Sequence, residues 1–352
     1  MRRPASRPGA RGHCLALSVY DPEGRAVKFS LFVAALAAAT IAAVAQSPAN
    51  ADAAALAPNG AIDADDAVLQ AAGTPRLTKP IIYIHGFETD SAANCQQFNP
   101  MKSFFENHSP EFTSTHHTVK YYDGDTNCGN NLSGYGDHSN HNPSGHRNGA
   151  HTPDTNIRHL GYHLAWFIWN RFSRDGRHVD IVAHSMGGLI TRYAMAQTAH
   201  DTAGFPPNLL VDDIVTLGTP HNGPRFFSSF GCAVLGGSPL QCDQMDGGSA
   251  FQQWLDDHAA QPNPIPRTDW TTVGSEDDNH VASNSATSMG AGTTKVIYND
   301  STNIEHGEFL TATRTVNDAD VLYKQPGDSW VLWTNAWWPV RWTQKSLYAN
   351  GY

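Results

Sequence analysis

The stretch VDIVAHSMGGLITRY, residues 179–193, changes its pattern at a single serine. Before Ser185 the residues are mostly β-branched, as in a buried strand, and after it apolar residues return with helical spacing. Ala183 and Gly187, two positions away on either side, are small, as a strained strand-to-helix turn requires. Such a turn lifts a serine hydroxyl above the sheet edge, and Gly188 lets the helix pack closely. The pattern predicts a nucleophile, and a serine that only caps a helix is the alternative.

The composition indicates a folded, acidic protein. The 352 residues are 40% hydrophobic and 16% charged, which is typical of a globular chain. Lys and Arg number 23 against 33 Asp and Glu, and the basic residues form no block. We therefore expect no nucleic-acid partner.

The first 51 residues have the features of a secretory signal peptide. Lys28 precedes the apolar run FSLFVAALAAATIAAVA, and small-residue cleavage sites follow at 43–45 and 49–51. An uncleaved membrane anchor is the alternative, although the run is Ala-rich and short for a span. The stretch before Val27 is too long and too rich in Pro and Arg for the start of a signal peptide. Because a valine codon can start translation in bacteria, we expect translation to begin at Val27. We expect residues 52–78 to form a loose leader.

Export to an oxidising compartment predicts that the remaining cysteines are paired. Cys14 lies in the leader, and an even number of cysteines remains beyond it: Cys95, Cys128, Cys232 and Cys242. Three pairings are open. We favour Cys232–Cys242, within one short loop, which leaves Cys95–Cys128. A zinc site is the competing interpretation, but no C-x-x-C spacing is present.

Strand-like and helix-like segments alternate along the rest of the chain. This order predicts a mostly parallel sheet with helices on both faces, in one domain over residues 79–352. We expect a long surface loop over 124–153 and a helix over 154–172 with Asp154 or Thr155 as its N-cap. The other expected strands and helix are 79–87, 117–125, 178–185, 186–200, 211–220, 269–278 and 293–300.

At this point the chain resembles an α/β-hydrolase, and more narrowly the secreted bacterial lipases and esterases with AHSMGG at the nucleophile turn. IHGF at 84–87, TLGTPHNGP at 216–224 and QMDGGSAFQQWL at 244–255 are similar to further motifs of that group, in the same order. The resemblance covers residues 79–315. It implies an α/β-hydrolase fold and a carboxylic-ester hydrolase that uses Ser, acid and His in that chain order.

A serine hydroxyl needs a base, and several histidines compete for that role. We predict His306, because TNIEHGEFL follows the last expected strand and precedes an apolar helix start, on the loop that the fold places beside the serine. His280 and His221 are the rivals; His221 comes too early in the chain order.

The acid has three adjacent candidates in GSEDDNHVAS. The resemblance implies an aspartate followed two or three residues later by an apolar anchor, and Val281 stands three residues after Asp278. We therefore predict Asp278 before Asp277, with Glu276 third. The role of Asp278 is to fix the tautomer of His306 and stabilise the imidazolium.

Two backbone N–H groups are expected to form an oxyanion hole. One belongs to Met186, after the nucleophile, and the other to Phe87, after IHG. Packing in the core is the alternative role for both side chains.

The substrate is less defined by the sequence. The resemblance favours esters with hydrophobic acyl chains, with amides and polyesters as alternatives. Residues 226–257 are suited to form a cap over an acyl pocket. The alternative is a surface insertion without a substrate role. The five tryptophans of 329–342 could contact a lipid interface or pack on the sheet edge. We expect a secreted monomer.

A second class of function is a binding protein. Four histidines of the expected loop, together with two nearby aspartates, could bind a divalent metal: His138, His141, His146, His151, Asp137 and Asp154. Because these histidines lack a fixed helical spacing, we predict no metal and no cofactor. A non-catalytic hydrolase relative is the other alternative, and the intact Ser, acid and His set argues against it.

Overall fold

The computed structural model describes residues 77–109, 112–136, 151–225, 232, 239–263 and 268–348, and the backbone of 19–20 and 26–27. The chain divides into two compact units, Met1–Leu56 and Ala57–Tyr352. In the first, β1 (Val19–Tyr20) pairs antiparallel with β2 (Ala26–Val27). The remainder of the predicted signal peptide and of the leader up to residue 76 lies outside the described residues.

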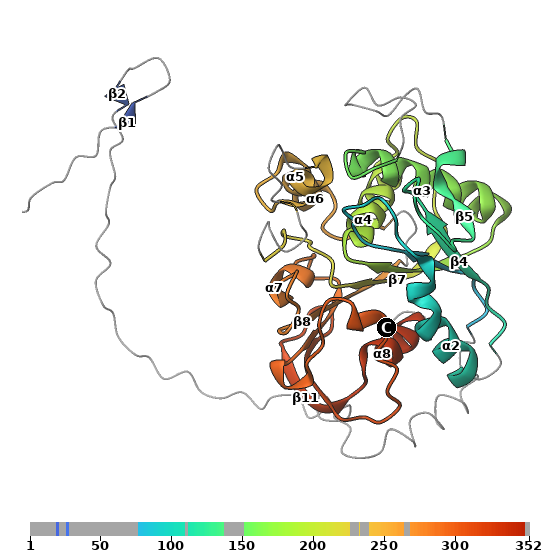
Figure 1. Cartoon of the computed structure of the whole chain (residues 1–352), viewed down its shortest axis with the longest axis vertical. Coiled ribbons are helices and arrows are strands. Elements are labelled where there is room, and N and C mark those ends of the chain that lie inside the picture. The colour runs from blue at the N-terminus through green and yellow to red at the C-terminus, as the bar shows by residue number, and fades with distance from the viewer. Residues whose placement is uncertain are drawn as a thin grey trace, which may run out of the picture. The chain divides into compact units, whose positions relative to one another are not determined.

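The second unit is built on a nine-stranded sheet in the order β11-β10-β9-β8-β7-β6-β3-β4-β5 (Figure 1). Every neighbouring pair from β5 to β9 is parallel, whereas β10 is antiparallel to both β9 and β11. The mostly parallel sheet predicted from the sequence is therefore confirmed. The strands are β3 (Ile81–Ile84), β4 (His116–Lys120), β5 (Asn130–Asn131), β6 (Val179–His184), β7 (Val211–Leu217), β8 (Asp269–Ser275), β9 (Thr294–Tyr298), β10 (Ala319–Lys324) and β11 (Val331–Ala336).

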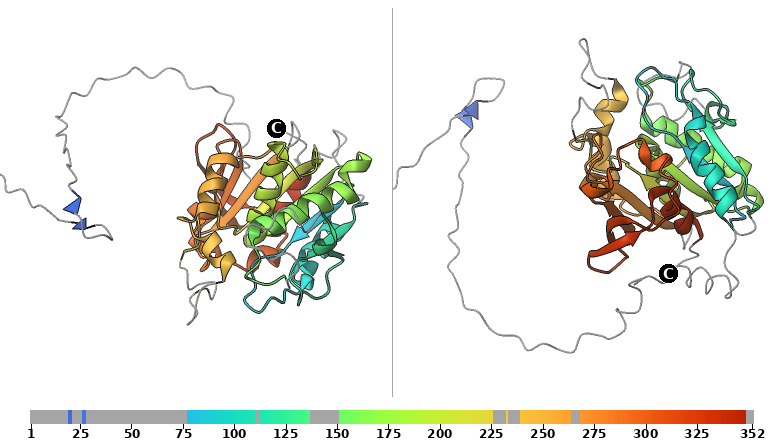
Figure 2. Two further views of the ribbon diagram at one scale, coloured as in Figure 1. Left: turned by 90° about the horizontal axis from the view of Figure 1, so that it is seen from above. Right: turned by 60° about the horizontal axis from the view of Figure 1, so that its bottom comes forward.

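Helices cover both faces of this sheet because its central strands are apolar on both sides. Ile82 and Ile84 of β3 join a buried cluster with α3 (Ile157–Arg171) and α4 (Met186–Ala199), which lie side by side in Figures 1 and 2. Their neighbours Ile81 and Tyr83 join a second cluster with α2 (Asn99–His108) and α8 (Pro339–Tyr348). Successive strand residues point to opposite faces, so one short strand serves both halves of the core. A mostly parallel sheet with helices on both faces is the α/β architecture that the sequence predicts.

The start of α3 differs from the sequence expectation. Asn156, and neither Asp154 nor Thr155, is the N-cap, and its side chain accepts a hydrogen bond from Arg158 N at 2.9 Å. Asp154 Oδ1 instead accepts from Leu240 N at 3.3 Å, and Thr155 Oγ1 accepts from Thr152 N at 3.0 Å. All three residue types cap helices well, but the side chains of Asp154 and Thr155 accept other hydrogen bonds, so Asn156 is the residue that caps the helix.

Two other segments depart from the expected pattern. The strand expected over 117–125 ends at Lys120, because the chain turns around Asp125. The expected loop 124–153 contains β5 and a short 3-10 helix, η3 (Leu132–Gly134), and its residues 137–150 lie outside the described residues.

The tryptophan-rich tail packs mainly on the edge of the sheet. Trp333, Trp337 and Trp342 lie with their ring centroids 5.3–5.5 Å apart, and Trp338 is 8% exposed. Only Trp330, at 42%, is strongly exposed in this group. Among the described residues, no helix combines the length and the apolar character needed to cross a bilayer.

Candidate active site

Ser185 lies at the sharp turn between β6 and α4, with φ 53° and ψ −130°. Few non-glycine residues adopt a positive φ, so the surrounding structure must hold this backbone in place. Ser185 N donates to Leu217 O at 2.9 Å. A Cβ on Gly187 would stand 2.5 Å from His85 O, and one on Gly86 would stand 2.7 Å from Ser185 Cβ. Glycine at these two positions is what allows β3 to approach the turn.

The hydroxyl of Ser185 does not cap the helix that follows it. Its side chain makes no capping hydrogen bond with α4, and Oγ has no hydrogen-bond partner among the described residues. The residue is only 2% exposed. The helix-cap interpretation is therefore wrong for this serine. Its hydroxyl stands at the N-terminus of α4, where the helix dipole favours developing negative charge.

Asp278 and His306 are brought together from two loops at the same sheet edge. Asp278 follows β8, His306 follows β9, and His306 Nδ1 donates to Asp278 Oδ2 at 2.8 Å. The second carboxylate oxygen accepts from His280 N at 2.8 Å and from Val281 N at 2.9 Å. Asp278 is fully buried. These bonds fix the carboxylate so that one oxygen faces the imidazole and holds it in the Nδ1–H tautomer.

The rival acids have other neighbours. Glu276 is exposed, and its Oε2 accepts from Asp300 N at 3.4 Å. Asp277 is half-buried, and its main-chain N–H donates to Ser275 Oγ at 3.2 Å.

Gly218, with φ +57°, lies under the Asp278–His306 pair. A Cβ here would stand 3.0 Å from Asp278 Oδ2 and 3.1 Å from His306 Cε1. Any other residue would therefore combine a strained backbone with pressure on the pair. This glycine belongs to the TLGTPHNGP segment noted in the sequence.

Two further histidines flank His306. His184 donates from Nε2 to the main-chain oxygen of His306 at 2.9 Å, and its ring centroid is 4.7 Å from that of His306. Burial and the neighbouring His306 lower the pKa of His184 to about 3, so it stays neutral. His280 stacks on His306 at 4.8 Å, and burial, followed by the nearby His306, lowers its pKa. Sequence reasoning gave His184 no role, although it directly precedes the nucleophile.

The other rival base, His221, is buried in the loop after β7. Its Nε2 lies 3.1 Å from Thr216 Oγ1, and its main-chain oxygen accepts from Arg192 at 3.4 Å. Burial, followed by the nearby Arg192, places the pKa of His221 well below its usual value. These contacts suit a neutral structural histidine.

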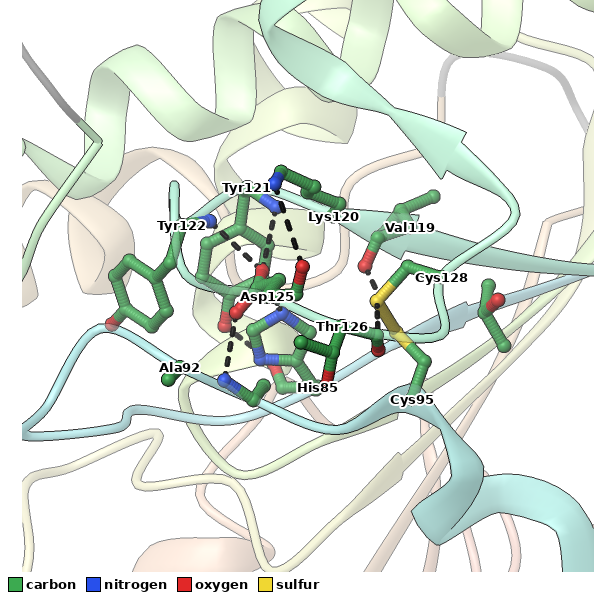
Figure 3. Close-up of polar contacts among 12 residues, drawn as sticks. His85, Ala92, Cys95, Val119, Lys120, Tyr121, Tyr122, Asp125, Thr126 and Cys128 are labelled. Atoms are coloured by element: carbon green, nitrogen blue, oxygen red, sulfur yellow. Dashed lines mark hydrogen bonds and ion pairs between the residues drawn. A yellow bond between two sulfur atoms is a disulfide. The ribbon is translucent and has the colours of Figure 1, made fainter.

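The segment expected to supply one oxyanion donor is held by a buried hydrogen bond between two side chains. His85, two residues before Phe87, donates from Nε2 to Asp125 Oδ2 at 2.8 Å, and both side chains are fully buried. Figure 3 shows Asp125 between His85 and the backbone of Tyr121 and Tyr122, both of whose N–H groups donate to it at 2.9 Å. The sequence interpretation did not include this pair. Asp125, the last residue of the expected strand 117–125, is the sequence signal that could have found it.

The disulfides match the favoured pairing. Cys95 joins Cys128, beside the His85–Asp125 pair (Figure 3), and Cys232 joins Cys242. Of the cap-like stretch 226–257, the structure describes Cys232 and residues 239–257, which include α5 (Leu240–Met245) and α6 (Ala250–His258).

Two groups of described side chains have a metal-ligand arrangement. One consists of Asp278, His280 and His306, which the acid and base interpretation already uses. The other consists of His151, His159 and His163. Of the metal-binding alternative over 137–154, only His151 and Asp154 fall within the described residues.

Comparison with known proteins points to the esterases. A sequence model of the family described as "Putative serine esterase (DUF676)" matches residues 132–238 and supports an esterase-type hydrolase. No curated protein matches the chain.

Several solved structures are similar to this chain at low identity. The mature Bacillus licheniformis lipase BlEst2 is 17% identical, with a TM-score of 0.36 over 57% of this chain and 67% of its own. Aspergillus fumigatus lipase B is 16% identical, with a TM-score of 0.36 over 58% of this chain and 39% of its own. A lipase-esterase related protein from Clostridium acetobutylicum is 12% identical, with a TM-score of 0.40 over 66% of this chain and 89% of its own. The chain thus spans well under half of the Aspergillus enzyme.

Proposed function

We propose that the protein is a serine hydrolase that cleaves carboxylic esters through an acyl-enzyme intermediate. Ser185 is the nucleophile, His306 the general base and Asp278 the acid that orients the base. The observation that carries this proposal is the 2.8 Å hydrogen bond from His306 to Asp278, on loops that follow strands parallel to β6. Parallel strands bring their carboxyl ends to one sheet edge, which is also where Ser185 stands.

The proposed chemistry follows from these positions. His306 takes the proton of the Ser185 hydroxyl as Oγ attacks the ester carbonyl carbon, and Asp278 stabilises the imidazolium. The main-chain N–H groups of Met186 and Phe87 receive the charge that develops on the carbonyl oxygen. His306 then protonates the departing alcohol. A water molecule, deprotonated by His306, releases the acid and restores Ser185.

The remaining features of the proposal concern substrate and location. An acyl chain is the expected substrate group, and residues 226–257 are the expected cap over it. Two disulfides support export to an oxidising compartment, in agreement with the predicted signal peptide. We propose a secreted monomer that meets its substrate without a cofactor.

A fluorophosphonate probe tests the proposal most directly, because it labels only an activated serine. We expect stoichiometric labelling of Ser185 in the parent. Ser185→Ala should abolish labelling and lower the hydrolysis of a p-nitrophenyl ester by about a million-fold. Ser301→Ala, in an exposed turn, is the matched control and should keep both. An unlabelled parent would favour a non-catalytic relative, and an active Ser185→Ala variant would remove the nucleophile assignment. Parallel assays with matched amides and a polyester separate the substrate classes.

A further inference from the structure

Three buried histidines lie together outside the proposed active site. His159 and His163 stand one turn apart on α3, and His151 lies in the segment that leads into that helix. Their exposed fractions are 4%, 0% and 7%, and one nitrogen from each ring lies within 4.8 Å of the other two. Residues four apart on a helix share one face, so the helix itself presents two of the imidazoles in the same direction.

The tautomer of His163 is fixed by a main-chain carbonyl. Its Nδ1 donates to Tyr135 O, so Nε2 carries the lone pair of the neutral ring. That Nε2 lies 3.0 Å from Nε2 of His159. A hydrogen bond from one imidazole nitrogen to a carbonyl, with the other nitrogen turned toward a shared point, is the usual environment of a histidine that binds a metal.

The carbonyl that orients His163 is itself held in place. The next residue, Gly136, has φ +85°, and a Cβ there would stand 2.6 Å from the ring of Tyr162 on α3. The backbone at Gly136 therefore packs directly against α3. On the other side, His151 O accepts from Asp123 N at 3.0 Å, which anchors the third histidine.

The ring geometry favours convergence on a point over stacking. His159 is at 82° to His163 and at 89° to His151, with centroid distances of 4.4 and 5.5 Å. Tetrahedral zinc with Zn–N bonds of about 2.0–2.1 Å holds its nitrogens roughly 3.3 Å apart. The 3.0 Å between the Nε2 atoms of His159 and His163 is close to that separation, so these two rings need only a small adjustment to hold one ion.

From these observations we infer that His151, His159 and His163 form a binding site for one divalent transition-metal ion, with Zn²⁺ as the main candidate. Neutral imidazoles suit zinc, copper and nickel, whereas calcium and magnesium prefer oxygen ligands. The group contains no carboxylate or thiolate among the described residues, which agrees with this selection. Three protein ligands leave a fourth position for water. The ion ties the segment around Tyr135 and His151 to α3, a stabilising role that is separate from ester hydrolysis.

The test is metal retention by the full-length protein. The chain is stripped with a chelator, loaded with Zn²⁺ and desalted, and its zinc content and melting temperature are measured. We expect about one zinc per parent chain and a rise of several degrees in Tm on loading. His159→Gln and His163→Gln should lose the bound zinc and the Tm rise. His108→Gln, an exposed histidine on α2, should keep both.

His280→Gln separates this site from the Asp278, His280 and His306 group. If zinc binding is lost in His280→Gln and retained in His159→Gln, the proposal is wrong. A parent that retains no zinc overturns it as well, and indicates that the histidines only hydrogen-bond to one another. If the α3 variants do not fold, Co²⁺ loading of the parent decides. A tetrahedral nitrogen-ligand spectrum that persists in His280→Gln supports the site, and its absence refutes it.

Discussion

The small residues on either side of Ser185 predict the strained strand-to-helix turn in which it lies. The small residues around it were readable from the sequence because a strained turn excludes larger ones. The structure adds the contact partners, namely the backbone of His85 against Gly187 and the side chain of Ser185 against Gly86. His85 and Gly86 directly follow β3, about a hundred residues earlier in the chain, so no local pattern could have indicated these contacts.

The choice of acid leads to a residue-level prediction. Asp278→Asn should keep the fold but lower ester turnover by up to about ten-thousand-fold, because an amide cannot hold His306 in the Nδ1–H tautomer. The test measures kcat on a p-nitrophenyl ester and the melting temperature, for the variant and for the parent. Asp277→Asn is the matched control and should change kcat little. A larger loss in Asp277→Asn, at unchanged melting temperature, would assign the acid to the neighbouring residue.

His184 and His280 mark the limit of residue-level reasoning. Their positions next to the proposed nucleophile and acid were visible, but their contacts with His306 depend on how two loops fold back over β6. A histidine beside a catalytic motif fits a base, a support or a surface group equally well. Only the distance from His184 Nε2 to the His306 carbonyl distinguishes a supporting role.

At the scale of elements, the loops after β3 and β4 behave as one unit. Cys95 N donates to Thr126 O at 3.0 Å, Thr126 N donates to Ala93 O at 2.8 Å, and the Cys95–Cys128 disulfide lies beside them. Asp125 completes the connection, because its Oδ1 accepts from Ala93 N and its Oδ2 from His85. Although burial opposes ionisation, the hydrogen bond and charge of His85 keep the pKa of Asp125 below its usual value.

This unit predicts an effect on catalysis from a residue that does not touch substrate. In Asp125→Asn, the amide NH₂ is a donor that must face other donors. It faces either the N–H of Ala93 or the donors of His85 and of the Tyr121 and Tyr122 backbone. We expect a loss of about 3 kcal/mol in stability. If the loop positions the Phe87 donor, kcat should fall by about a hundredfold with little change in KM.

The measurement is a steady-state comparison well below the melting temperature. Asp123→Asn changes an exposed carboxylate two residues away and should leave stability and kcat nearly unchanged. A destabilised Asp125→Asn variant with the kcat of the parent would limit the His85–Asp125 hydrogen bond to a structural role.

The elements that the sequence predicted are those in which period and burial agree. The central strands are apolar on both faces and the turns between them are clear, so β3 and β6 to β9 were identified. The hairpin β10–β11 was missed because it is half-exposed and its second strand lies in the tryptophan-rich stretch 329–342, which fits a lipid contact as well as a sheet edge. The three-histidine group was missed for a related reason: two members share a helix face, whereas His151 joins them only through the fold.

At the scale of the whole molecule, charges lie at the sheet edge away from Ser185. Lys79, just before β3, contacts Asp180 Oδ1 at 2.8 Å and Asp213 Oδ2 at 2.9 Å, and Asp212 at 3.2 Å. Burial raises the pKa of Asp180 to about 7, and burial together with Asp180 raises that of Asp213 to about 8. Lys79 offsets part of this effect but cannot fully compensate two buried carboxylates.

These raised pKa values give the stability a defined pH dependence. A carboxyl group whose folded pKa is above its unfolded value favours folding at low pH, and that contribution is lost as the pH rises through the folded pKa. For Asp213 the loss runs from the unfolded pKa of about 3.9 to about 8. Asp125, with its lowered pKa, acts in the opposite sense and weakens the fold only under acid conditions.

Asp213→Asn should therefore stabilise the protein, because the amide resembles the protonated carboxyl group and can still accept from Lys79. We expect a gain that is absent near pH 4, grows with pH and levels off above pH 8 at on the order of a few kcal/mol. Calorimetric melting across this range measures it. Asp212→Asn is the matched control: its side chain is 27% exposed and contacts the same lysine, so it should show little pH-dependent gain. An Asp213→Asn variant that is less stable than the parent at pH 8 would mean that its bond to Lys79 outweighs the cost of burying its charge.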